Sequence, residues 1–117
     1  MVSLVLVLSL TLADASADNP KYAPPAVAAA QARLERAGSV LGAASLCPEI
    51  DRERLRAAAD KMTALIDKGV DDNSQYYAAH NIFDKGIDSG KAGIRTHAND
   101  CRRAAADLSA LEKELGP

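Results

Sequence analysis

The sequence predicts an all-α protein, a small bundle of three to four helices with one disulfide bond between helices. Alanine makes up 24 of the 117 residues, with three Tyr, one Phe and no Trp. Strands instead favour β-branched and aromatic residues. Apolar residues also recur at intervals of three and four, as on one face of a helix. Prolines and glycines separate these stretches, and the length suits a single domain.

The N-terminal residues 1–17 are predicted to be a signal peptide. Residues 2–13 are apolar and uncharged, and a run of about twelve is too short for a membrane span, which needs roughly 20. Ala15 and Ala17 form an A-x-A cleavage signal, so we expect cleavage after Ala17. A buried N-terminal helix is the alternative. The expected product is periplasmic or secreted and has no membrane span.

After the signal peptide we expect an extended, Pro-rich leader over residues 18–25 and a helical domain over residues 26–117. The expected helices cover residues 25–45, 49–68, 74–88 and 92–115. We interpret Asp88-Ser89-Gly90 as the turn between the last two, with one long helix over 74–115 as the alternative. Gly38 and Gly42 weaken the first helix and would allow a close contact with another helix.

Cys47 and Cys101 are expected to form a disulfide, because two cysteines in an exported chain most often pair. The bridge would close a loop of 53 residues and would stabilise the fold by roughly 4 kcal/mol in the chain-entropy model. That is a large share of the roughly 5–10 kcal/mol expected for a domain of this size.

Metal or haem binding is the alternative use of the same residues. Cys47, His80, His97 and Cys101 could form a zinc site. On a helix, His97 and Cys101 would face the same way, so a free Cys101 could also be a reactive thiol. Met62 with His80 or His97 could ligate haem, although C-x-x-C-H is absent. There is no G-x-S-x-G, phosphate-loop or H-E-x-x-H motif, so we predict a non-enzyme without a cofactor.

Three aromatic residues, Tyr76, Tyr77 and Phe83, form a candidate partner-binding surface, because aromatics concentrate binding energy. Core filling is their ordinary role and the alternative. The 14 basic and 16 acidic residues give a net charge of −2, which does not favour a nucleic-acid partner. We expect a monomer or weak homodimer whose partner is an envelope protein.

Several short motifs occur in a characteristic order: Leu41-Gly42-Ala43, Leu46-Cys47, a charged amphipathic helix, Phe83-x-x-Gly86-Ile87, and Cys101 on an Ala-rich last helix. With the export signal, this order resembles small exported two-cysteine helical proteins of alphaproteobacteria, a family of unknown function. The resemblance implies a periplasmic helical fold with one bridge. The predicted function is thus that of a non-catalytic periplasmic binding or envelope-stress protein, with a metal- or haem-binding bundle as the alternative.

Overall fold

The computed structural model describes the backbone of residues 25–68 and 73–116, and the side chains of residues 30–68 and 77–116. Over these residues the chain forms four helices and no strand, which confirms the all-α prediction. They are α2 (Pro25–Ser45), α3 (Arg52–Lys68), α4 (Asn73–Arg95) and α5 (Cys101–Leu115). The predicted signal peptide and all of the leader before Pro25 lie outside the described residues. None of the described helices is long and apolar enough to cross a membrane.

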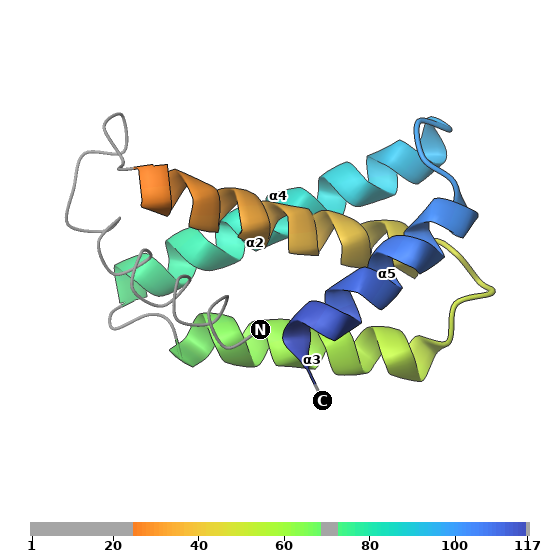
Figure 1. Cartoon of the computed structure of the whole chain (residues 1–117). Coiled ribbons are helices and arrows are strands. Elements are labelled where there is room, and N and C mark those ends of the chain that lie inside the picture. Colours follow the sequence, from red (N-terminus) through yellow and green to blue (C-terminus); the bar gives the residue numbers. More distant parts are fainter. Residues whose placement is uncertain (1–24, 69–72, 117) are drawn as a thin grey trace.

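Helix α2 is the centre of the bundle and packs against the three other helices. Helix α4 runs alongside α2 in the same direction, whereas α3 and α5 run the opposite way (Figure 1). Because α2 has neighbours on several sides, its buried apolar side chains extend beyond one face; they are those of Ala30, Leu34, Ala37, Val40, Leu41, Ala43 and Ala44. The other helices complete the core with Ala58, Met62, Ile66, Ala79, Phe83, Ala104, Leu108 and Leu111.

The α2–α4 contact depends on four buried glycines, which we call the glycine seam: Gly38 and Gly42 of α2, and Gly86 and Gly90 of α4. A Cβ atom at Gly42 would overlap the carbonyl oxygen of Ile87, and one at Gly90 would overlap that of Ser39. Glycine lets two helix backbones approach this closely because it has no side chain. The close contact predicted for Gly38 and Gly42 is therefore confirmed.

The last two helices meet at a different place from the one predicted. Helix α4 continues through Gly90 to Arg95, so both the turn at residues 88–90 and the single helix over 74–115 were wrong. The chain turns instead at residues 96–100, where His97 has a φ of 62°. Asp100 then caps α5, because its Oδ1 accepts a hydrogen bond of 2.8 Å from the backbone N–H of Arg103. Glycine lowers the stability of a helix by roughly 1 kcal/mol per residue relative to alanine. In α4 the packing of its glycines against α2 outweighs this loss.

The second predicted helix also begins later than expected, at Arg52 rather than at residue 49, because residues 46–51 form a turn. The Arg52 guanidinium holds this turn against the end of α2. It donates hydrogen bonds of 2.6–3.1 Å to four carbonyl oxygens, those of Ala44, Ser45, Cys47 and Ile50. Carbonyls at a helix C-terminus have no partner within the helix, so Arg52 satisfies them and fixes the position of Cys47.

The disulfide predicted from the cysteine count is present between Cys47 and Cys101, whose Cα atoms are 5.5 Å apart. It joins the turn after α2 to the first residue of α5. Cys101 therefore begins the last helix, whereas the prediction placed it inside that helix. Both cysteines of the chain are used in this bond.

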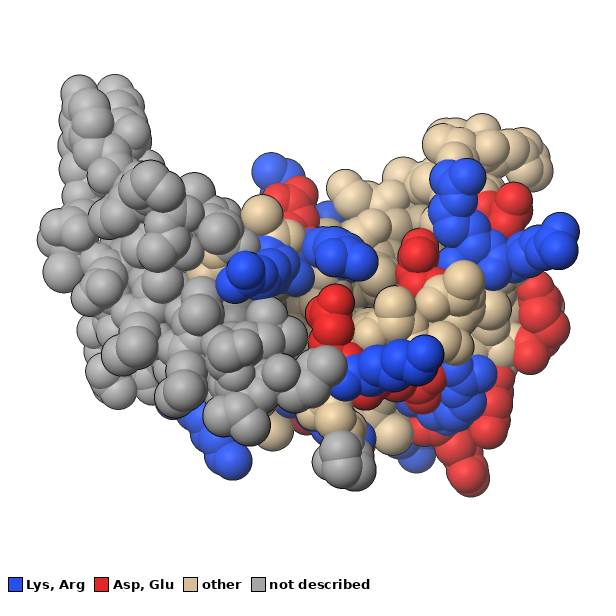
Figure 2. Space-filling view, viewed as in Figure 1, with Lys and Arg blue, Asp and Glu red and all other residues tan. Residues whose placement is uncertain are grey.

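Polar contacts tie α3 to α5. The Arg54 guanidinium donates to the Glu112 carboxylate at 2.5 and 3.1 Å, and Lys61 Nζ donates to the Gly116 carbonyl at 2.7 Å. The hydrogen bond from Arg54 lowers the pKa of the Glu112 carboxyl. Where Figure 2 shows described residues, basic and acidic side chains are interspersed, and this part of the surface has no large area of one charge.

Candidate functional site

The candidate site is an apolar groove of about 220 Å³ between α2, α3 and α4. Its lining residues are Leu41, Ser45, Leu55, Ala59, Phe83, Ile87 and Lys91. We call this the α3–α4 groove, because α3 and α4 form its two walls and α2 forms its floor. Five of the seven lining residues are apolar.

The groove exists because α3 and α4 are both held by α2 but pack only lightly on each other. Glycines bring α4 close to α2, while Arg54 and Lys61 tie α3 to α5. On the walls, Leu55, Ala59 and Ile87 remain only partly buried. The short side chain of Ala59 leaves space that a larger residue would fill.

The groove has an apolar end and a polar end. Phe83, Ile87 and Lys91 follow one another at intervals of one helical turn along α4, a length of about 12 Å at 1.5 Å per residue. Helices α2 and α4 are parallel, and Gly42 lies against Ile87, so Ser45 lies toward the Lys91 end. The Ser45 hydroxyl donates to the Gly42 carbonyl at 2.6 Å.

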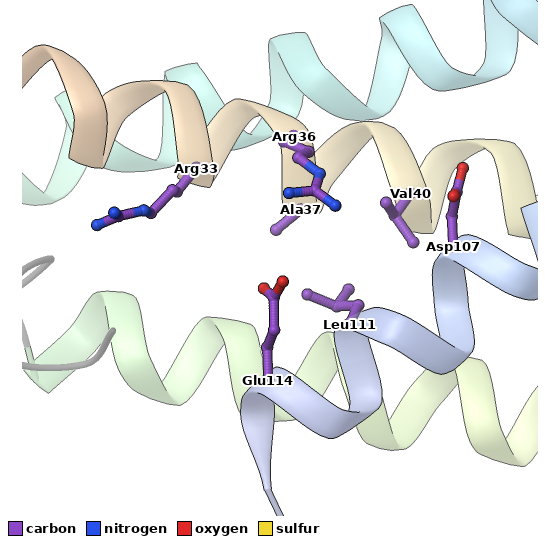
Figure 3. A pocket seen from close by; sticks show the side chains of 7 residues that line it. All are labelled: Arg33, Arg36, Ala37, Val40, Asp107, Leu111 and Glu114. Carbon is purple, nitrogen blue, oxygen red and sulfur yellow. The ribbon is translucent and has the colours of Figure 1, made fainter. Parts of the chain in front are cut away.

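A second hollow lies between α2 and α5 and is too small for a ligand. Figure 3 shows Arg33 and Arg36 of α2 across from Asp107 and Glu114 of α5, with Leu111 between the helices. Its volume is about 20 Å³, which is close to the space that one water molecule needs. The hollow can hold a water molecule between opposite charges, but not an organic molecule.

The cysteines of the proposed zinc set are not available as ligands in this structure. Among the described residues, one group of three candidate ligand atoms lies within 4.8 Å, from Cys47, Glu49 and Cys101. Zinc binds the thiolate form of cysteine, and both sulfur atoms are bonded to each other. In this group only the carboxylate of Glu49 remains as a possible metal ligand.

The histidines are also not brought together. His80 lies within α4 and its Nε2 is 3.7 Å from Oδ1 of Asp67 at the end of α3. His97 lies in the turn after α4, and α4 extends about 22 Å beyond His80 before that turn begins. The prediction that His97 and Cys101 share a helix face was wrong, because the two residues are not on one helix. Met62, the third candidate haem ligand, is 2% exposed and packs in the core.

The aromatic residues divide between the core and the surface. Phe83 is 6% exposed and belongs to the core, so its ring is not a free anchor for a partner, although it lines one end of the groove. Tyr77 is 65% exposed, and the side chain of Tyr76 lies outside the described residues. Sequence reasoning missed Leu55, Ala59 and Lys91 as site residues, because their convergence depends on how α3 sits beside α4.

No family model, curated protein or solved structure matches the chain. The resemblance to exported two-cysteine helical proteins therefore stays a prediction.

Proposed function

We propose that this chain is an exported, non-catalytic binding protein that takes an apolar ligand into the α3–α4 groove. The observation that carries the proposal is the groove itself. It is larger than an engineered apolar cavity of about 150 Å³ that stays dry and binds benzene. At about 220 Å³ the groove is smaller than the roughly 300–1,000 Å³ of pockets for drug-sized ligands, so we expect a small molecule as the occupant.

The proposed location is the periplasm. Disulfides form and persist in oxidising compartments, and the Cys47–Cys101 bond supports such a compartment. The A-x-A sequence ending at Ala17 supports removal of the leader. The intact mass of protein from the periplasmic fraction should correspond to a chain that begins at Asp18 and lacks two hydrogens. Full-length or reduced protein in that fraction would contradict this location.

A neutral fluorescent probe tests the groove. N-phenyl-1-naphthylamine fluoresces strongly in apolar surroundings, so titration of the oxidised protein should give a saturable increase for one site. Ala59→Leu adds three carbons to the groove wall and should weaken probe affinity by roughly tenfold or more, since it occupies the ligand's space. Ala57→Leu, on the exposed side of α3, is the matched control.

The control should bind the probe like the wild type. Absence of saturable binding, or equal binding by the Ala59→Leu and Ala57→Leu variants, would refute the proposal. Circular dichroism of each variant at the titration temperature shows whether the fold is intact.

A further inference from the structure

We infer that the ligand of the α3–α4 groove is a single-chain carboxylate amphiphile, an unbranched acid of medium length. Its alkyl chain lies along α4 past Phe83 and Ile87, and its carboxylate pairs with the ammonium group of Lys91. This inference rests on the proposed function and adds the chemical class of the ligand.

The charge of the groove lining indicates that the head group of the ligand is anionic. Lys91 is the one charged residue of the lining, and its side chain is half-buried. The ion pairs among the described residues join Arg54 to Glu112 and His80 to Asp67, so Lys91 has no acidic side chain at salt-bridge distance there. A carboxylate at this end of the groove can pair with the Lys91 ammonium, and such a charge-assisted hydrogen bond is stronger than one between neutral groups.

A single lysine also favours a carboxylate over a phosphate. Lysine binds an anion as a single point charge. The groove lining contains no arginine and no second basic residue. A carboxylate carries one negative charge, which Lys91 can neutralise, while a phosphate dianion would keep an uncompensated charge.

The length of the groove indicates the length of the ligand's alkyl chain. From Phe83 to Lys91 the groove follows α4 for about 12 Å. An extended chain advances about 3.5 Å for every three bonds, so about ten bonds span this length. A carboxylate with eight to ten carbons therefore fits, and the tail ends near Phe83 and Ala59. Each methylene that leaves water for this surface adds to affinity until the groove is full.

Calorimetric titration of the oxidised protein with decanoate, decanol and decyltrimethylammonium, each below its aggregation concentration, tests the inference. Decanoate should bind roughly tenfold more tightly than decanol, and the cationic amphiphile should bind weakest. Lys91→Met should bind decanoate no better than decanol. Lys85→Met, an equal charge change on the exposed side of α4, should keep the wild-type preference. Palmitate should gain little over decanoate, because its extra carbons lie outside the groove.

The outcomes separate this inference from the proposed function. Equal binding of decanoate and decanol by the wild type would overturn the inference and leave an apolar binding site. A decanoate preference that survives Lys91→Met would also overturn it. If neither decanoate nor decanol binds and the neutral probe does not bind either, both proposals fail.

Discussion

Replacing Gly90 by alanine should force α2 and α4 apart. A Cβ atom at this position would overlap the carbonyl oxygen of Ser39 and lie 2.8 Å from the backbone nitrogen of Ala43. Both obstacles are backbone atoms, so no side-chain rotation can relieve them. Gly93, three residues later on the same helix, is the matched control, because its Cβ would meet only the Cβ of Asn99, at 3.6 Å.

The two substitutions should change stability in opposite directions. Alanine in place of glycine stabilises a helix by about 1 kcal/mol, and Gly93→Ala should keep most of that gain. Overpacking costs about 1–3 kcal/mol, and we expect the upper end for Gly90→Ala because the seam is the main helix contact. The net loss is then about 2 kcal/mol, which lowers the melting temperature by about 10 °C in a domain of this size.

Thermal and urea unfolding of the oxidised proteins, followed by circular dichroism, would measure both effects. The double variant Gly42→Ala/Gly90→Ala should lose less than the sum of the single losses, because helices already separated by one methyl group accommodate the second more easily. A Gly90→Ala protein as stable as the Gly93→Ala protein would refute the close contact between α2 and α4.

Three further substitutions test other parts of the fold. Cys47→Ser should lower the free energy of unfolding by up to about 4 kcal/mol, measured against the oxidised wild type. Arg52→Met should cost about 1–2 kcal/mol in urea unfolding, since it removes the hydrogen bonds of the guanidinium to the end of α2 and to the turn, whereas Arg56→Met, one turn later, should cost little. Arg54→Met should cost about 0.5 kcal/mol near neutral pH, because its pair with Glu112 is largely exposed. That difference should vanish as the pH falls through the depressed pKa of Glu112, since protonation ends the pairing.

Each of these expectations has a contradicting result. A Cys47→Ser protein as stable as the oxidised wild type would mean that the bridge does not stabilise the fold. Equal losses for Arg52→Met and Arg56→Met would mean that the carbonyl contacts of Arg52 are unimportant. A cost of Arg54→Met that persists at a pH well below the depressed pKa of Glu112 would show that its origin is packing rather than the ion pair.

The first helix could be predicted because its signal lies in neighbouring residues, and the disulfide because the chain has two cysteines and hence one possible pair. Pro25 marks the start of α2, and Leu34 and Leu41 keep the helical spacing, so the predicted bounds agree with Pro25–Ser45. The bridge followed from there being two cysteines in a chain with a predicted export signal. Neither inference needed knowledge of how the helices pack.

The turn and the groove could not be predicted because both depend on packing between distant segments. The low helix propensity of glycine suggested a turn at Gly90. The propensity alone could not show that Gly90 lies inside α4, where the backbone of α2 packs against it. Likewise, Leu55 and Phe83 lie on different helices, and the space between them depends on the position of α3. The positive φ of His97 had no sequence signal that we recognised.

The parallel arrangement of α2 and α4 determines when the disulfide can close. In a chain made from its N-terminus, Cys47 exists 54 residues before Cys101, an interval of several seconds at about 5–20 residues per second. During that time its thiol can react only with other molecules. Cys101 follows α4, which carries the chain back to the same end of the bundle (Figure 1), so in the folded protein the bridge holds together the ends of segments that lie far apart in the sequence. Oxidation before Cys101 is made could therefore join Cys47 only to another molecule, so the native bridge requires an oxidant that acts after the chain is complete.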